Sequence, residues 1–216
     1  MQILRNLVVT AACLCSLPAF ALSDEGRQAL AGLQSRWAEI NYRLPKDARE
    51  AAFETLGQTA DRAVKAEPDA PELLIWHGII LSTWAGAKGG LGALSLVKEA
   101  RANFEAALAI DPRALDGSAY TSLGSLYYQV PGWPIGFGDD KRAEAMLQKA
   151  LEINPTGIDP NYFYGDYLYH QKRYAQARTA LLRAQAAPDR PGRALADEGR
   201  RGEIRALLGK VEAELH

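Results

Sequence analysis

Three stretches of this sequence share one pattern: an alanine, a large apolar residue, a second alanine and a closing proline. They span residues 100–112 and 143–155, with a looser copy at 177–188. In the first copy Ala100 and Phe104 fall on one helical face, because residues three or four apart lie above one another on a helix. The small alanines allow a second helix to approach closely. A stripe that recurs in this way predicts a series of packed helices.

Each of these helices follows another stretch in which large residues surround a glycine. The glycines are Gly78, Gly124 and Gly165. A glycine on a helix leaves room for a tight crossing with a neighbouring helix. We therefore predict three helical hairpins, each with a glycine-bearing first helix and an alanine-striped second helix.

This pattern resembles the tetratricopeptide repeat (TPR), whose signature runs from an aromatic residue through Leu-Gly, Tyr, Ala, a large apolar residue and Ala to a closing Pro. The resemblance covers roughly residues 71 to 188. It implies an all-α fold, an α-solenoid of TPR-like hairpins, and a function in binding other proteins.

The spacing between glycine and alanine separates one regular hairpin from two enlarged ones. Gly165 and Ala177 lie 12 residues apart, as in the family, but the intervals in the two upstream hairpins are 22 and 19 residues. The additional residues fall in 85–92 and 130–140, which are rich in residues that end helices. Because both insertions occupy the same position in a repeat, we expect enlarged loops on one face of the stack.

The first residues are typical of a secretory signal peptide. Arg5 precedes an apolar run from Leu7 to Leu17, and the segment closes with Ala19-Phe20-Ala21. This layout predicts export to the bacterial periplasm and cleavage after Ala21. The apolar run is too short to span a bilayer, which takes roughly 20 residues.

Both cysteines lie inside this leader, so we expect no disulfide in the mature chain. An alternative is a lipid anchor on Cys13. It is disfavoured because Thr10 occupies the position where lipoprotein signals carry leucine.

The predicted domain organisation has four parts. Residues 22–70 contain two amphipathic stretches and form a degenerate first hairpin, and the last segment has an apolar face suited to covering the end of a stack. The expected boundaries are a signal peptide at 1–21, the degenerate hairpin at 22–70, three TPR-like repeats at 71–190 and a capping helix at 191–216.

Composition and motifs argue against several classes of function. The formal net charge is −1, without a basic stripe of the kind that nucleic acid requires. The glycines around Lys88 lack the order of a P-loop, and the three histidines lack metal-ligand spacing. We therefore predict no catalytic site, no metal, no cofactor, no nucleic-acid partner and no membrane span after the leader. An enzyme with a serine nucleophile stays open, although no nucleophile motif appears.

Counting from each glycine transfers the groove positions of the TPR family to this chain. The resemblance implies that these polar and aromatic positions bind a protein segment. An alternative is that the tyrosines pack between hairpins. The positions are Ser118, Thr121, Ser125 and Tyr128 in one repeat and Asp159, Tyr162, Asp166 and Tyr169 in the next.

The insertion at 131–140 is the second candidate contact surface. Trp133 and Phe137 resemble the aromatic anchors that dominate interfaces, and Asp139 and Asp140 follow them. The alternative is structural, with both aromatic rings folded back on the hairpin and one aspartate capping the next helix.

The leader and the irregular insertions also resemble the T-component family of periplasmic TRAP-type transporter systems. That resemblance implies a periplasmic solute-binding protein as partner, and homo-oligomers. The resulting hypothesis is a periplasmic protein-binding scaffold that serves solute uptake or envelope assembly. The alternative is a carrier of a small apolar ligand, held between helices in a cavity walled by the glycine-rich loops.

Overall fold

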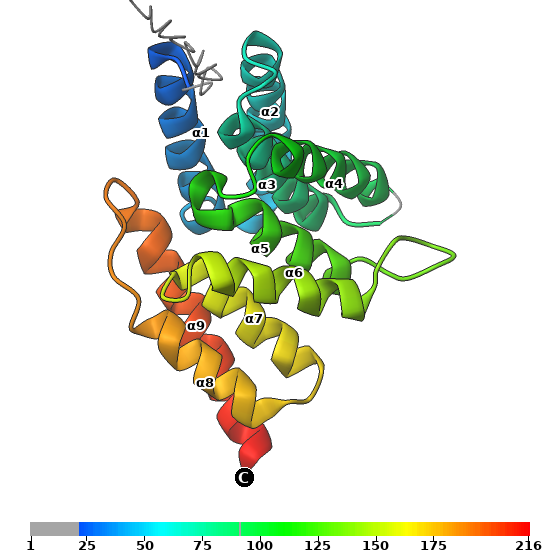
Figure 1. Cartoon of the computed structure of the whole chain (residues 1–216), viewed down its shortest axis with the longest axis vertical. Coiled ribbons are helices and arrows are strands. Elements are labelled where there is room, and N and C mark those ends of the chain that lie inside the picture. The colour runs from blue at the N-terminus through cyan, green and yellow to red at the C-terminus, as the bar shows by residue number, and fades with distance from the viewer. Residues whose placement is uncertain (1–21, 91) are drawn as a thin grey trace, which may run out of the picture.

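The structure is a computed structural model that describes residues 22–90 and 92–216. The predicted signal peptide, 1–21, with Cys13 and Cys15, lies outside the described residues. The described residues form helices joined by turns and loops, without a strand (Figure 1). The helices are α1 Asp24–Tyr42, α2 Lys46–Ala66, α3 Pro71–Lys88, α4 Ala93–Ile110, α5 Ala114–Gln129, α6 Asp140–Ile153, α7 Ile158–His170, α8 Tyr174–Gln185 and α9 Ala194–Leu215.

The helices pack as successive hairpins. The pairs α3–α4, α5–α6 and α7–α8 share the most extensive contacts, and each pair also contacts the next along the chain. Figure 1 shows the hairpins stacked from the top of the molecule to the bottom. The predicted all-α solenoid of TPR-like hairpins is therefore confirmed. Of the two enlarged loops that the sequence predicted, the one between α5 and α6 is present. In the upstream hairpin the prediction was wrong, because residues 85–88 extend α3 to Lys88 and α4 begins at Ala93.

The three glycines lie at equivalent helix crossings. A Cβ atom at Gly78 would lie 2.5 Å from Phe104 Cε1, and one at Gly124 would lie 2.6 Å from Leu147 Cγ. At Gly165 it would lie 2.7 Å from a leucine Cγ in the third hairpin. Phe104 and Leu147 are both fully buried. The glycine therefore makes space for the large apolar residue of the partner helix in each hairpin, as the sequence predicted.

The start of α5 is left-handed. Leu115, Asp116 and Gly117 have φ values of 47°, 55° and 75°, which lie in a backbone region that residues other than glycine rarely adopt. A Cβ atom at Gly117 would also come within 2.9 Å of the side chain of Ile153. The regular right-handed part of the helix begins only at Ser118.

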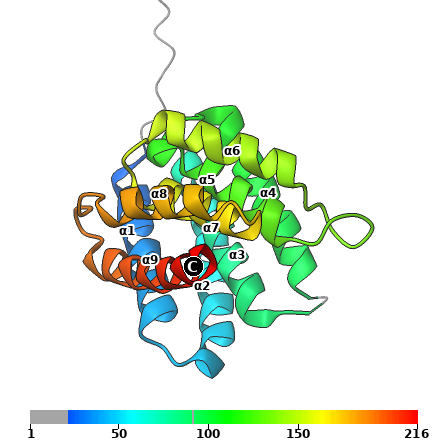
Figure 2. The same ribbon diagram turned by 90° about the horizontal axis from the view of Figure 1, so that it is seen from below.

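Helix α9 covers the end of the stack and also reaches back to its beginning. It packs against α8 and α7, and it contacts α1 as well. Figure 2, which looks at the molecule from below, shows α9 next to α8, with the C-terminus toward the viewer. The buried core of α1, α2 and α3 includes Ala196 of α9, so the last helix is shared between the two ends of the solenoid. Among the described residues, no helix combines the length and apolar character needed to cross a membrane.

Candidate functional site

The inner face of the solenoid lines an open cavity of about 1270 Å³. The first helices of the hairpins, α1, α3, α5 and α7, all contribute to its wall, together with parts of α2 and α4, the start of α9 and the segment that precedes α9. Helices α6 and α8 contribute no residue to this lining. The glycine-bearing helices therefore face inward, and the alanine-striped helices of the last two hairpins lie outside them.

Four of the eight predicted groove residues line this cavity. They are Ser118, Thr121 and Ser125 on α5 and Asp159 on α7. Thr121 is buried, and the two serines are half-buried. The structure therefore brings together the small polar positions that the TPR resemblance selected on these two helices.

The other four predicted groove residues lie outside the cavity lining and contact one another or neighbouring helices. The Tyr128 hydroxyl donates a hydrogen bond to Asp166 Oδ2 at 2.6 Å. Burial raises the pKa of Tyr128, and the adjacent Asp166 carboxylate raises it further. Tyr169 packs against Tyr174, with ring centroids 5.7 Å apart, and Tyr162 lies beneath a guanidinium of α9. The three tyrosines therefore pack against neighbouring helices, which was the alternative to binding a protein segment in the groove.

Asp159 is already engaged by two arginines from the C-terminal part of the chain. Arg190 Nη1 lies 2.5 Å from Asp159 Oδ2, and Arg200 Nε lies 2.8 Å from Asp159 Oδ1. Burial alone would raise the pKa of Asp159, but the charges of Arg200 and Arg190 outweigh it and hold the pKa at about 2. Arg190 also pairs with Asp197, which is buried. The cavity wall at this end is therefore a network of charges.

Sequence reasoning missed this network. The terminal segment was interpreted from its apolar face, which includes the buried Leu207 and Val211. The available signal was that Arg190, Asp197 and Arg200 recur at intervals close to two and one helical turns at the start of that segment. Asp159, the partner of the two arginines, is more than thirty residues away from them, so this pairing emerges only from the fold.

The insertion between α5 and α6 is held by backbone hydrogen bonds at its base. The N–H of Gly138 donates to Pro131 O at 3.0 Å, and that of Asp139 donates to Tyr127 O at 2.8 Å. Phe137 packs edge-on against Tyr127, with ring centroids 5.9 Å apart. The guanidinium of Arg101 lies 4.9 Å from the Phe137 ring. The loop is therefore anchored to the hairpin on one side.

The four predicted contact residues of this loop have different environments. Phe137 folds back on the hairpin, whereas Trp133 is 91% exposed at the far end of the loop. Asp139 caps α6 by accepting hydrogen bonds from the N–H groups of Lys141 and Arg142, at 3.0 and 3.1 Å. Asp140 begins the helix and is exposed. The capping alternative is thus confirmed for Asp139, and of the two aromatic residues only Trp133 projects outward.

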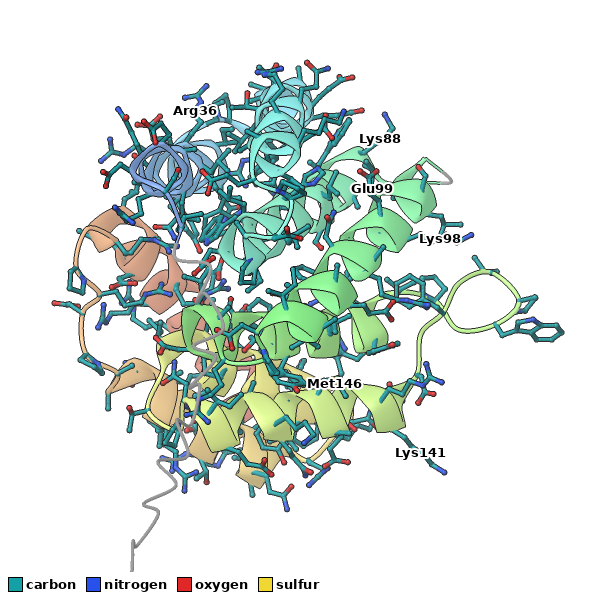
Figure 3. All side chains as sticks on the ribbon, turned by 45° about the horizontal axis from the view of Figure 1, so that its top comes forward. Arg36, Lys88, Lys98, Glu99, Lys141 and Met146 are labelled. Atoms are coloured by element: carbon teal, nitrogen blue, oxygen red, sulfur yellow. The ribbon has the colours of Figure 1, made fainter. Side chains whose placement is uncertain are left out.

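Figure 3 shows the loop projecting from the body of the molecule, with Lys98 and Lys141 on either side of it. Ile135 on the same loop is 60% exposed. In the part of the chain that the structure describes, no group of three or more histidine, cysteine or acidic residues is arranged to hold a metal. The site therefore offers two surfaces, the inner cavity and the outward Trp133 loop.

Comparison with solved structures identifies a fold of the same kind. The chain is similar to the crystal structure of a thermophilic TPR protein from Thermus thermophilus, with a TM-score of 0.61 and 22% sequence identity. The similarity covers 88% of this chain and 82% of that chain. No model of a known family matches the sequence, and no curated protein is significantly similar to it. The predicted TPR-like fold is confirmed, and the narrower resemblance to TRAP T-components stays a prediction.

Proposed function

We propose that this protein is a periplasmic scaffold that binds another protein through the Trp133 loop. The observation that carries the proposal is the 91% exposure of Trp133 on an anchored loop. A tryptophan in water gains much apolar contact when a partner covers it, and tryptophan is enriched among residues that dominate binding energy. Because the backbone bonds of Gly138 and Asp139 already fix the base of the loop, less conformational entropy is lost on binding.

The fold supports this proposal at a general level, since a stack of helical hairpins presents extended surfaces to a partner. The proposal assigns the chain a binding function and no catalytic site. The finer proposal is an accessory component of a TRAP-type uptake system, with a periplasmic solute-binding protein as partner. Its support is the leader at 1–21 together with the enlarged hairpin loop between α5 and α6.

Site-specific photo-crosslinking in cells tests the protein-binding proposal. A photo-reactive amino acid at position 133 is expected to give a defined crosslinked product, identified by mass spectrometry. The same group at Leu182, which is 40% exposed on α8, serves as the control. Equal labelling from both positions, or no product from position 133, would contradict the proposal. Recovery of a solute-binding protein would support the TRAP assignment, and recovery of a second copy of the chain would replace it by self-association.

Cell fractionation tests the proposed location separately. The mature protein is expected in the periplasmic fraction with Leu22 as its first residue. Retention of residues 1–21 in a cytoplasmic product would contradict export.

A second candidate function is a carrier of a small apolar ligand, favoured by the size of the inner cavity. Its volume of about 1270 Å³ exceeds that of typical small-molecule sites, about 300–1,000 Å³. The end of α3 with the turn that follows it and the α5–α6 loop both contribute to the wall, through Gly86 and Gly90 on one side and Pro131 and Ile135 on the other. Native mass spectrometry of protein purified from the periplasm is expected to show a retained small molecule if this function is correct.

A further inference from the structure

Arg193 is a cavity-lining arginine without a carboxylate partner among the described residues. It immediately precedes α9, and its guanidinium carbon lies 4.8 Å from the centroid of the Trp76 ring. Its Nε is buried, and no described residue accepts a hydrogen bond from it. The neighbouring Arg190 and Arg200 differ, since each pairs with two carboxylates. Of Arg190, Arg193 and Arg200, only Arg193 has a guanidinium that no described carboxylate contacts directly.

The hydroxyl of Tyr42 is a second buried donor in the same corner of the cavity. Tyr42 ends α1 and lines the cavity, and its hydroxyl has no hydrogen-bond partner among the described residues. Trp37 connects the two donors, because its ring packs 5.7 Å from that of Tyr42 and 5.9 Å from that of Trp76. Arg193 in turn lies over Trp76. Both unsatisfied donors therefore belong to the corner formed by α1, α3 and the start of α9.

Leaving two buried donors unpaired is unfavourable, because each loses its hydrogen bonds to water without replacement. Burial and the charge of Arg190 lower the pKa of Arg193, although Asp159 and Asp197 oppose this effect. A ligand that supplies acceptor oxygens in this corner would give these donors the partners that the described residues do not provide. In a corner shielded from bulk water, such charge-assisted hydrogen bonds are stronger than neutral ones.

The excess of basic over acidic residues along the whole cavity also favours an anionic ligand. Five basic residues line it, against three acidic ones, in a chain whose formal net charge is −1. The acidic lining residues include Asp159, close to the same corner, and their presence disfavours a doubly charged group such as phosphate. A single guanidinium and one hydroxyl match the acceptors of a monoanionic carboxylate, to which arginine binds in a bidentate manner.

The adjoining wall is apolar and aromatic. Trp37, Phe53, Trp76 and Ile79 all line the cavity, and all but Ile79 are buried. Such a wall suits a hydrocarbon or aromatic body rather than a sugar. We propose that the corner between α1 and α9 binds the carboxylate of an organic acid with an apolar body, paired with Arg193 and hydrogen-bonded by the Tyr42 hydroxyl. This inference rests on the second candidate function, ligand binding in the cavity.

Fluorescence titration of the mature chain tests the inference with a matched pair of probes, dansylamino-undecanoic acid and its methyl ester. The wild-type protein is expected to bind the acid at least tenfold more tightly than the uncharged ester, because only the acid pairs with Arg193. Arg193→Gln is expected to weaken binding of the acid at least tenfold and to leave the ester unchanged. The control Arg183→Gln, on the exposed surface of α8, is expected to change neither affinity.

Tyr42→Phe provides a second variant that removes only the hydroxyl, should Arg193→Gln disturb packing against Trp76. It is expected to weaken binding of the acid about tenfold, without effect on the ester and without loss of thermal stability in the ligand-free protein. Equal affinity of the wild type for acid and ester would overturn the carboxylate site and leave the carrier function standing. No binding of either probe at millimolar concentration would overturn both. Displacement of the acid by inorganic phosphate at equal concentration would overturn the assignment to a monoanion.

Discussion

The repeated hairpins and the C-terminal junction, where Asp159 meets Arg190 and Arg200, are both interfaces between helices, but they are held together by different forces. In the hairpins a glycine faces a large apolar side chain, as Gly124 faces Leu147. At the junction Asp159 of α7 is paired with Arg190 and Arg200. Apolar packing tolerates small adjustments of its neighbours, whereas a buried charge depends on its partner being present. The end of the stack is therefore the more sensitive of the two interfaces to loss of a single group.

The largest expected effect comes from Asp159→Ala, which leaves both arginines without one of their carboxylates. We expect the free energy of unfolding to fall by about 3 kcal/mol in urea titrations, the low end of the cost of breaking a buried ion pair, because Asp159 and Arg190 are about 30% exposed and each arginine keeps a second carboxylate. Asp189→Ala is the matched control, because Asp189 is 86% exposed where it pairs with Arg201, and its loss should change stability by less than about 0.5 kcal/mol. Similar values for the two variants would remove the distinction between the junction and an ordinary surface.

Gly124→Ala tests the hairpin side of the comparison. The new Cβ atom would lie 2.6 Å from Leu147 Cγ, so the two helices must move apart, and we expect a loss of roughly 2–3 kcal/mol. Gly32→Ala on α1 is the control, because no atom lies within 4 Å of its Cβ position. There alanine should stabilise the helix by about 0.5–1 kcal/mol. A stabilising effect at both positions would show that the crossing is not tight.

Acid titration separates the two interfaces by pH. The pKa of Asp159 is lowered from 3.8 to about 2, so its contribution to stability is complete above pH 4 and is lost as the pH falls to about 2. The shift corresponds to about 2 kcal/mol. Across that interval wild-type stability should therefore fall by about 2 kcal/mol more than that of Asp159→Asn, measured by urea unfolding at each pH. Parallel pH profiles would show that the junction does not depend on the ionised carboxylate.

The smallest effect is expected from Glu212→Ala. Glu212 Oε1 lies 2.6 Å from Arg178 Nε and links α9 to α8, but both side chains are more than 40% exposed. Solvent screens such pairs, so stability should change by less than about 0.5 kcal/mol. A loss as large as that of Asp159→Ala would mean that every ion pair of α9 contributes alike, whether it is buried or not.

The sequence predicted the repeating part of the fold because the same contact recurs in it. One glycine, one large apolar residue and two alanines per hairpin were sufficient to place Phe104, Leu147 and Leu181 at equivalent crossings. The junction has no repeat to compare with. Arg190 and Arg200 meet Asp159 only because α9 folds back along α7, and local sequence contains no information about that approach.

The predicted placement on the inner face was also correct for some residues of the candidate site and wrong for others. The TPR resemblance, counted from Gly124, implied that Ser118, Thr121 and Ser125 lie on the inner face, and they line the cavity. Spacing could not separate these positions from Tyr128 and Tyr169, whose long side chains reach other aromatic rings and Asp166 instead. Side-chain length and the position of neighbouring helices decide that outcome, and neither follows from a count of residues.

The contact between α1 and α9 has a consequence for how the molecule unfolds. In an open solenoid each repeat touches only its neighbours, so the ends fray independently of the middle. Here Tyr42 and the residues around Gly199 tie the first helix to the last. Opening either terminus therefore exposes the other, and the chain should lose its structure as one cooperative unit, with amide hydrogen exchange equally slow at both ends.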